Sequence, residues 1–281
     1  MESNSIVQKK QTISILGCGW YGLAMAKRLV AEGYTVKGSS TSPDKLELLS
    51  SLSILPFLLN FQEHSVESDP DFFHTDILLI AIPPKRSSSE QSSFPGKIKK
   101  IAALASSQKI PQVIFISSTA VYADANAEIT ESTPAQPDTE SGKAILETEQ
   151  LLASNPSFST TILRFAGLIG PGRNPGRFFA GKQDIPNGQA PVNLLHQEDC
   201  VEFTLTLIQQ AAFGRIYNVC SPDHPSKQEF YVKAAQQSGL PLPSFQDELL
   251  KWKIISSTAN STLNYQYRIA DFSKWMDTDH L

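Results

Sequence analysis

Short apolar runs alternate with segments of helical hydrophobic spacing along the first 170 residues. The runs that predict buried strands are 12–16, 34–36, 55–59, 76–82, 112–116 and 160–165. Helical spacing recurs in 23–30, 98–105 and 144–152. Between these elements, the polar segment 85–93 predicts a mobile loop. Such alternation predicts right-handed crossovers, and therefore an α/β fold with a doubly wound parallel sheet.

The pattern changes after residue 170. Segments 171–176 and 184–191 are rich in glycine and proline, which indicates loops. A helix at 198–210 and a strand at 215–219 continue the sheet pattern, and Ser226 with Glu229 forms a capping box that begins another helix. We therefore expect one domain of residues 1–170, to which 192–220 return. The remaining segments form a small C-terminal lobe: 171–191 and 221–281.

Three glycines lie where the first predicted strand meets the first helix. Gly17 permits a tight turn, Gly19 lets the backbone approach a pyrophosphate, and Gly22 lets the helix pack close to the strand. The free amides and positive dipole end of the helix favour phosphate groups there. Trp20 and Tyr21, between the last two glycines, either pack on the sheet or cover the pyrophosphate. The pattern predicts a Rossmann-like dinucleotide site in the first domain.

The end of the second strand predicts which dinucleotide binds. Sites for NAD carry a carboxylate about 20 residues after the glycines, but the first one after this strand is Asp44. Lys37 and Lys45 favour a 2′-phosphate, and so do small hydroxyl side chains. These are Ser39, Ser40 and Thr41. We therefore predict NADP over NAD, although the serines also suit a turn in which Ser42 caps a helix that begins with Pro43.

Ligands of open α/β sheets bind outside the carboxyl ends of the strands. The strand at 76–82 ends in residues that we therefore expect beside the cofactor: Ala81, Ile82 and Pro83.

Composition and charge narrow the class of protein. The chain has 281 residues, a net charge of −4 and five scattered histidines, so nothing indicates a nucleic-acid partner, an anionic membrane or a metal site. The three cysteines form no CxxC pattern, which predicts reduced thiols. The first eleven residues are polar, and no apolar run is as long as a membrane span. We expect a soluble cytoplasmic protein.

The segment 116–122, Ile-Ser-Ser-Thr-Ala-Val-Tyr, resembles the extended branch of the short-chain dehydrogenase/reductase superfamily, the group of nucleotide-sugar epimerases and dehydratases. The resemblance covers nearly the whole chain. The GxGxxG spacing is closer to atypical, epimerase-like members than to the usual GxxGxxG. Further segments resemble that group in type and order: 17–22, 163–173, 193–199 and 216–219.

The resemblance implies a catalytic set with one departure. Ser118 matches the residue that hydrogen-bonds the reacting oxygen, and Lys143 matches the lysine that lowers the pKa of a catalytic tyrosine and holds the nicotinamide ribose. Thr139 stands where that tyrosine is expected, and no other tyrosine has a lysine four residues on. A threonine hydroxyl ionises far too weakly to replace a phenolate. Three explanations remain: another acid/base such as Glu140 or Ser141, a proton from water or substrate, or cofactor binding without redox chemistry.

Further roles follow from the same resemblance. Ser117, Ala166 and Gly167 are implied as cofactor neighbours, the last two at the nicotinamide. Arg173 and Arg177 lie in a loop where they either bind an anionic substrate or are solvated. His196 is expected to make a structural hydrogen bond. A homodimer is common in the resembled family, but no residue here requires one.

The sequence thus predicts an NADP-binding protein of oxidoreductase or epimerase type. Its substrate would be small and polar or resemble a nucleotide sugar. The alternative is a non-catalytic sensor or scaffold that binds NADP(H).

Overall fold

The computed structural model describes residues 11–61, 66–67, 69–84, 88–257 and 262–278. Its central sheet has seven strands in the order β12-β9-β7-β6-β1-β2-β3, and every neighbouring pair is parallel. The strands are β1 (Thr12–Leu16), β2 (Thr35–Ser40), β3 (Leu55–Leu58), β6 (Ile77–Ile80), β7 (Gln112–Ser118), β9 (Ser159–Phe165) and β12 (Ile216–Val219). The α/β doubly wound sheet expected from the sequence is confirmed.

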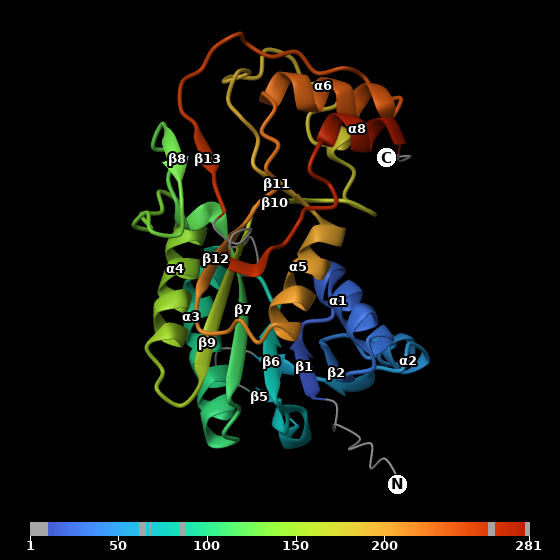
Figure 1. Cartoon of the computed structure of the whole chain (residues 1–281), viewed down its shortest axis with the longest axis vertical. Helices are drawn as coiled ribbons and strands as arrows, with labels where there is room; N and C mark the ends of the chain where they lie inside the picture. The colour runs from blue at the N-terminus through green and yellow to red at the C-terminus, as the bar shows by residue number, and fades with distance from the viewer. Residues whose placement is uncertain (1–10, 62–65, 68, 85–87, 258–261, 279–281) are drawn as a thin grey trace, which may run out of the picture.

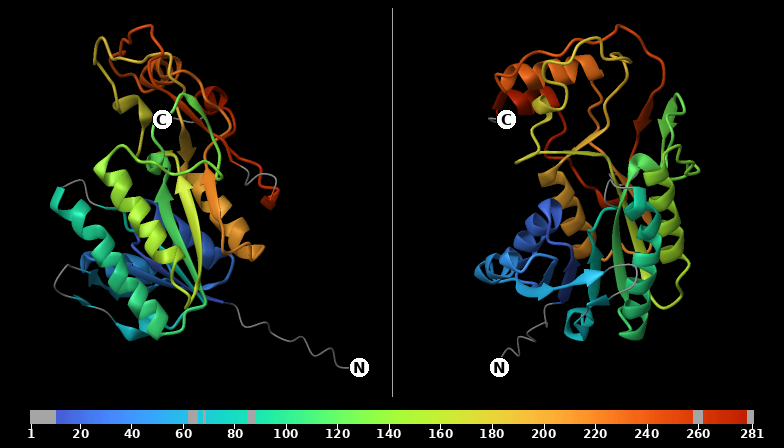
Figure 2. Two further views of the ribbon diagram at one scale, coloured as in Figure 1. Left: turned by 90° about the vertical axis from the view of Figure 1, so that its left-hand side faces the viewer. Right: turned by 180° about the vertical axis from the view of Figure 1, so that it is seen from behind.

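Helices cover both faces of this sheet. Helices α1 and α5 pack together over one face, and α3 and α4 pack together over the other (Figures 1 and 2). The helices are α1 (Trp20–Ala31), α2 (Asp44–Ser51), α3 (Ser88–Ser107), α4 (Glu140–Ala153), α5 (Gln197–Gln209), α6 (Lys227–Gln237) and α8 (Phe272–Thr278). Because the strand order reverses between β1 and β6, the turn after β1 lies at the topological switch point, where such sheets bind ligands.

Short elements connect the sheet to the C-terminal lobe. The small strands are β4 (Asn60–Phe61), β5 (Val66–Glu67), β8 (Ala127–Ile129), β10 (Gly167–Ile169), β11 (Leu194–His196) and β13 (Lys253–Ile255), which pair as β4-β5, β8-β13 and β10-β11. Three 3-10 turns span Pro70–Phe73, Thr119–Val121 and Pro175–Arg177. Helices α6 and α8 lie beyond the carboxyl ends of the sheet strands (Figure 1).

The described residues form two apolar cores. The larger joins the sheet to its helices, and the smaller joins α6 and α8 to β10 and β11 through residues such as Phe230, Phe272 and Trp275. The tail after β13 belongs to the larger core, in which Leu263, Tyr265 and Tyr267 are buried. This segment, which the sequence assigned to the lobe, therefore packs on the sheet and its helices.

Two local expectations are wrong. Helix α3 begins at Ser88, ten residues before the predicted start, so most of the predicted loop 85–93 is helical; 85–87 lie outside the described residues. Phe94 is buried one helical turn before Ile98, so the apolar face of α3 begins earlier than the sequence pattern predicted. Pro95, which lies inside α3, interrupts the helical pattern in the sequence. The residue before α2 is Pro43, with no side-chain cap, so Ser42 does not have the predicted capping role.

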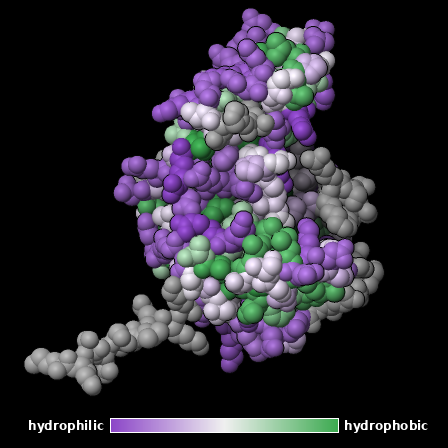
Figure 3. Space-filling view, turned by 90° about the vertical axis from the view of Figure 1, so that its right-hand side faces the viewer, coloured by the Kyte–Doolittle hydropathy of each residue, from purple (hydrophilic) through white to green (hydrophobic). Residues whose placement is uncertain are grey.

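Strand β3, at one edge of the sheet, carries exposed apolar side chains at Leu55 and Leu58, and Leu48 of the adjacent helix α2 is also exposed. Figure 3 shows hydrophobic surface in the lower half of this side of the molecule. Pro56 has no N–H to donate, which limits the pairing of a further strand at this edge. Within the described residues, no helix is long and apolar enough to cross a membrane.

Candidate functional site

The glycine turn after β1 has the geometry that the motif predicts. Gly17 has a φ of +101°, a conformation that L side chains rarely adopt. A Cβ on Gly22 would lie 2.1 Å from the carbonyl oxygen of Gly17, so only glycine lets α1 approach the turn this closely. A Cβ on Gly19 would meet no atom within 4 Å, which leaves the space where a phosphate is expected.

Ser39, at the end of β2, braces this turn. Its hydroxyl oxygen accepts a hydrogen bond from the Gly17 amide at 2.9 Å, and its carbonyl oxygen accepts one from the Cys18 amide at 2.8 Å. Ser40 similarly accepts a bond from the Ser42 amide at 3.0 Å. The predicted cofactor residue Ser39 is buried, and its two hydrogen bonds hold the turn.

A cavity of about 530 Å³ opens beside the turn, at the carboxyl ends of β1, β2 and β6. Eight of the predicted cofactor residues line it: Gly17, Gly19, Ser39, Ser40, Thr41, Ala81, Ile82 and Pro83. Sequence reasoning missed the segment after β3, although the fold brings it to the same edge. The residues it adds are Leu59, Asn60 and Phe61.

Two lysines line the cavity, and only one was predicted. Lys45, in the first turn of α2, is one; Lys97, in α3, is the other. Lys37 lies elsewhere, because its Nζ donates to the carbonyl oxygens of Asp71 and His74, at 2.7 Å for His74. The prediction that Lys37 stands beside a 2′-phosphate is therefore wrong.

Cys18, inside the glycine motif, also lines the cavity. Burial raises the pKa of its thiol to about 12, against a weaker opposing effect of the Ser39 backbone. The thiol therefore stays protonated near neutral pH and is a poor nucleophile. All three cysteines are buried and free, as the sequence predicted.

Trp20 and Tyr21 have different surroundings. Tyr21 packs into the large core, where its ring meets Phe165 edge to face and its hydroxyl bonds Thr204 at 2.8 Å. Trp20 lies at the surface of the turn, and its indole Nε1 donates to the carbonyl oxygen of Pro171 at 2.6 Å. Tyr21 is thus a packing residue, while Trp20 links the glycine turn to Pro171.

The predicted catalytic segments meet at the carboxyl end of β7. Ser118 ends this strand, and its hydroxyl oxygen accepts a hydrogen bond from the Ala120 amide at 3.1 Å. The first turn of α4 presses against the same turn, because a Cβ on Gly142 would lie 2.4 Å from the Ala120 carbonyl oxygen. Ala166 and Gly167 follow the neighbouring strand β9, whose Phe165 pairs with Ser118.

The remaining members of the expected set have structural partners. Thr139 is the N-cap of α4, and its hydroxyl accepts a bond from the Gly142 amide at 3.1 Å. Lys143 forms an ion pair with Glu140 at 2.7 Å, with side chains that are 57% and 79% exposed. The structure thus brings Ser118 and the start of α4 together, but these contacts give Thr139 and Lys143 no acid/base pairing.

A buried polar network lies beneath this strand end and was missed by sequence reasoning. Arg164 of β9 donates from Nε to Glu149 of α4 at 2.9 Å and from Nη1 to the Tyr122 hydroxyl. Ser117 donates to the same carboxylate, and the Tyr122 hydroxyl donates to Asn218 at 3.1 Å. Burial raises the pKa of Tyr122 despite the opposing charge of Arg164, so this phenol stays protonated. The network positions β7, β9 and α4 relative to one another, and the Ser117 hydroxyl is one of its donors.

Another missed side chain reaches the loop after Tyr122. Lys253 of β13 donates to the Tyr122 carbonyl oxygen at 2.6 Å and pairs with Asp124 at 3.1 Å. Asn193 holds β13 in place, since its Nδ2 donates to the Lys253 carbonyl oxygen at 2.8 Å. Because Lys253 lies more than one hundred residues from its partners, no local pattern indicated this contact.

The substrate-loop predictions separate in space. Arg173 stacks on Trp20, with its guanidinium carbon 4.2 Å from the ring centroid. Arg177 ends the 3-10 turn that packs on α6, on the lobe side. His196 is the N-cap of α5: its Nδ1 accepts a bond from the Glu198 amide at 3.3 Å, the structural role that was expected.

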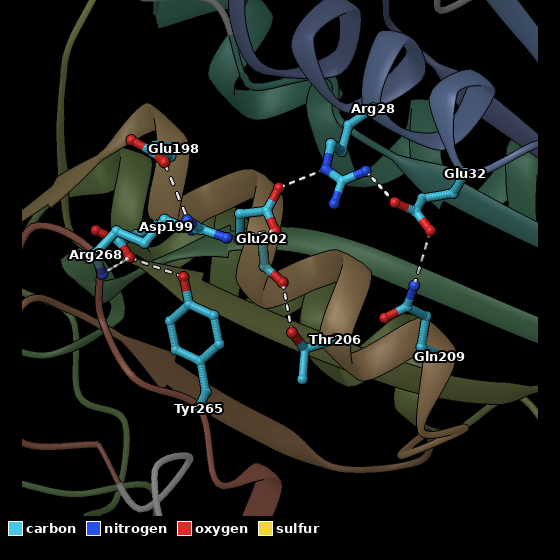
Figure 4. A network of polar contacts seen from close by, with 9 residues as sticks. All are labelled: Arg28, Glu32, Glu198, Asp199, Glu202, Thr206, Gln209, Tyr265 and Arg268. Carbon is cyan, nitrogen blue, oxygen red and sulfur yellow. Dashed lines mark hydrogen bonds and ion pairs between the residues drawn. The ribbon is translucent and has the colours of Figure 1, made fainter.

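A second polar network fixes α5 against α1 and the C-terminal tail (Figure 4). Asp199 is fully buried and accepts hydrogen bonds from the Tyr265 hydroxyl at 2.8 Å and the Arg268 amide at 2.7 Å. Glu202 accepts a bond from Arg28 of α1 at 2.6 Å. These contacts hold the helix that faces the glycine turn. Among the described residues, no group of three or more potential metal ligands is present.

Two family models match the chain. The NAD dependent epimerase/dehydratase family matches residues 98–220, and the family described as NADP oxidoreductase coenzyme F420-dependent matches 12–121. Together with the seven-stranded sheet and the glycine turn, these matches define an atypical extended short-chain dehydrogenase/reductase. The chain belongs to the NAD-dependent epimerase/dehydratase family.

A full-length relative supports this membership. Protein YeeZ of Escherichia coli K12 is 38% identical over 265 residues, which cover 92% of this chain and 96% of YeeZ.

Solved structures share the fold. A UDP-glucuronic acid 4-epimerase of Bacillus cereus in complex with NAD aligns with a TM-score of 0.78 at 16% identity, covering 96% of this chain and 97% of the epimerase. Human epimerase family protein SDR39U1, with NADPH, aligns with a TM-score of 0.70 at 15% identity, covering 94% and 97%.

Proposed function

We propose that this protein binds NADP(H) at the glycine turn and carries out oxidoreductase or epimerase-type chemistry on a small polar or nucleotide-sugar-like substrate. One observation carries the cofactor part: the 530 Å³ cavity lies at the switch point of the sheet and is lined by the glycine turn. Open space at Gly19 and the N-terminus of α1 suit a pyrophosphate.

The lining of this cavity supports NADP over NAD. Among the described residues that line it, two are lysines and none is acidic. Lys45 lies beside Ser40 and Thr41 at the end of β2, where a ribose 2′-phosphate of NADP would be placed. Solved structures of the same fold include several complexes with NAD as well as one with NADPH, so this preference depends on the residues of this chain alone.

Ser118 supports the catalytic part of the proposal. Its oxygen accepts the Ala120 amide, which leaves the hydroxyl hydrogen to donate to the oxygen of a substrate. A bound nicotinamide would supply or accept the hydride. Thr139 caps a helix and cannot act as general base, so the proton must come from water, from the substrate, or from a side chain at the start of α4 such as Glu140.

A second candidate is an NADP(H) sensor or scaffold without turnover. The arrangement at the start of α4 favours it, because the Lys143 ammonium pairs with Glu140 and the Thr139 hydroxyl is used as a cap. Such a protein would report cofactor binding through the lobe that contains α6 and α8.

Two measurements test both candidates. Titration with NADPH, NADP and NADH, followed by protein fluorescence, tests cofactor binding. NADPH oxidation is then measured with a panel of carbonyl compounds and nucleotide sugars, for the wild type, Ser118→Ala and the control Ser154→Ala, an exposed serine outside the site. Turnover that only Ser118→Ala abolishes supports the enzyme. Tight binding without turnover supports the sensor, and the absence of nucleotide binding overturns both.

A further inference from the structure

The turn 170–173 is fastened onto the first residue of α1. Trp20 donates from its indole nitrogen to the Pro171 carbonyl oxygen at 2.6 Å, and the Arg173 guanidinium stacks 4.2 Å from the centre of the same ring. From the other side, Gln197 of α5 donates to the Trp20 carbonyl oxygen at 2.9 Å. Trp20 therefore joins the glycine turn, the start of α5 and a loop about 150 residues away in sequence.

Turn 170–173 itself has a defined shape. Its ends are joined by a hydrogen bond from the Arg173 amide to the Gly170 carbonyl oxygen at 2.8 Å, and Gly170 and Gly172 have φ values of +132° and +75°. A Cβ on Gly170 would lie 3.0 Å from His196 Nε2, so the turn also packs closely on the end of β11. Arg173 is thus presented from a turn whose backbone is held on both sides.

We infer that Arg173 binds the pyrophosphate of the cofactor, with Trp20 as the platform that holds its guanidinium beside the glycine turn. This inference depends on the proposed dinucleotide site and names an additional residue of it. The sequence offered Arg173 as a candidate for binding an anionic substrate, and this inference assigns it to the cofactor instead.

Three physical considerations support this assignment. The ring belongs to the residue that begins α1, so a guanidinium stacked on it lies next to the helix end that attracts phosphates. An aromatic face orients a guanidinium without neutralising its charge. The planar fork of donors on arginine matches phosphate oxygens, and the exposed side chain of Arg173 pays little desolvation cost on binding.

Arg177 provides the contrast. It lies in the next turn of the same loop, where Gly176 packs so closely on α6 that a Cβ would lie 2.5 Å from the Ala234 carbonyl oxygen. This contact packs the turn of Arg177 on α6, whereas Arg173 stacks on Trp20. The two arginines, equal in charge and both exposed, therefore form a matched pair for experiment.

The test uses ligands that separate the two phosphate groups of NADP. ADP-ribose contains the pyrophosphate without a 2′-phosphate, and adenosine 2′-monophosphate contains the 2′-phosphate without a pyrophosphate. Their dissociation constants, and that of NADPH, are measured by calorimetry for the full-length wild type, Arg173→Ala, Arg173→Lys and Arg177→Ala. Circular dichroism and thermal unfolding establish that each variant is folded.

Arg173→Ala should lower the affinity for NADPH and for ADP-ribose by about tenfold or more, which is the loss expected for a charge-assisted hydrogen bond. Its affinity for adenosine 2′-monophosphate should equal that of the wild type. Arg173→Lys should restore part of the affinity, and Arg177→Ala should bind all three ligands as the wild type does. Wild-type affinity of Arg173→Ala for ADP-ribose overturns the inference, as does an equal loss for all three ligands. If the wild type binds none of them, the proposed cofactor site itself fails, which is a distinguishable result.

Discussion

The Thr139 hydroxyl accepts a hydrogen bond from the Gly142 amide at 3.1 Å and so caps the N-terminus of α4. The resemblance seen in the sequence predicts a catalytic tyrosine at this position, where this chain has Thr139. Threonine is among the preferred capping residues, whereas a phenol hydroxyl lies too far from the backbone to cap the same turn. The Thr139 hydroxyl thus has a local structural role, and the effect of removing it is measurable as a change in stability.

Thr139→Ala should lower the free energy of unfolding by about 1 kcal/mol, because the Gly142 amide loses its partner. Thr139→Ser keeps a hydroxyl at the same place and should stay close to the wild type. Urea unfolding measures both, and NADPH titration should show unchanged affinity in each. Loss of turnover in Thr139→Ala at wild-type stability would instead give Thr139 a direct role in the reaction.

Ser39→Ala should destabilise the glycine turn. The Gly17 amide would lose the hydroxyl that accepts its hydrogen bond at 2.9 Å, which costs about 1–3 kcal/mol for a buried donor. NADPH should also bind more weakly, since the turn is no longer held in its binding geometry. Ser51→Ala, at an exposed serine of α2, is the control and should change neither quantity. If Ser39→Ala bound NADPH as tightly as the wild type, nucleotide binding would not depend on this hydrogen bond.

The predictable parts of the fold are those with local causes. Strand β6 is a continuous apolar run, strands β1, β7 and β9 each contain short runs of apolar and β-branched residues, and the glycine turn is specified by Gly17 and Gly22 within six residues. Local sequence also shows the capping box of Ser226 and Glu229, which the structure confirms. Each of these features depends on neighbouring residues, so the sequence pattern is sufficient to find it.

The parts that were missed depend on contacts between distant segments. Lys37 is two residues before Ser39 of the predicted phosphate site, yet its ammonium bonds the carbonyl oxygens of Asp71 and His74, in a segment that the fold brings beside β2. Lys97 reaches the cavity from α3 in the same way. Glu149 lies on the buried face of α4, between Ile145 and Leu152, and Arg164 lies in a strand, but no spacing in the sequence indicates that the two side chains pair.

Glu149→Gln should be strongly destabilising. It would leave the Arg164 guanidinium buried opposite a neutral amide, and breaking a buried pair on one side costs about 3–5 kcal/mol. Urea unfolding measures the loss. Glu147→Gln removes an exposed carboxylate two residues earlier and should change stability by less than about 0.5 kcal/mol. A loss in Glu149→Gln as small as in Glu147→Gln would show that the network is not important for stability.

The capping box of α6 predicts a pH dependence. Hydrogen bonds from the hydroxyl and the backbone amide of Ser226 hold the pKa of Glu229 below its ordinary value of 4.5. A carboxylate with a lowered pKa in the folded state stabilises the protein above its unfolded pKa, and this contribution is lost as the pH falls through the lowered value. Wild type should therefore exceed Glu229→Gln in unfolding free energy near neutral pH, and the difference should shrink in acid.

Chemical unfolding at about pH 7 and about pH 3.5 measures that difference. The same comparison in a Ser226→Ala background is the control, because the donor hydroxyl is then absent and the pH-dependent difference should be smaller. A difference between wild type and Glu229→Gln that is constant with pH would contradict the capping explanation.

Lys45 and Lys37 form a matched pair for the cofactor preference. Lys37 lies within β2 and Lys45 in the first turn of α2, but Lys45 lines the cavity, whereas Lys37 bonds backbone carbonyl groups and is not among the lining residues. Lys45→Ala should lower the affinity for NADPH about tenfold and leave the affinity for NADH unchanged. This loss is at the lower end for a charge-assisted contact, because Lys45 is exposed and its charge is screened. Lys37→Ala should leave both affinities at their wild-type values.

The titrations should be repeated at higher salt, where the advantage of NADPH over NADH should decrease in the wild type but not in Lys45→Ala. Tighter binding of NADH than of NADPH by the wild type would reject the 2′-phosphate site, whereas an equal effect of both lysines would show that general surface charge, and not the position of Lys45, attracts the cofactor.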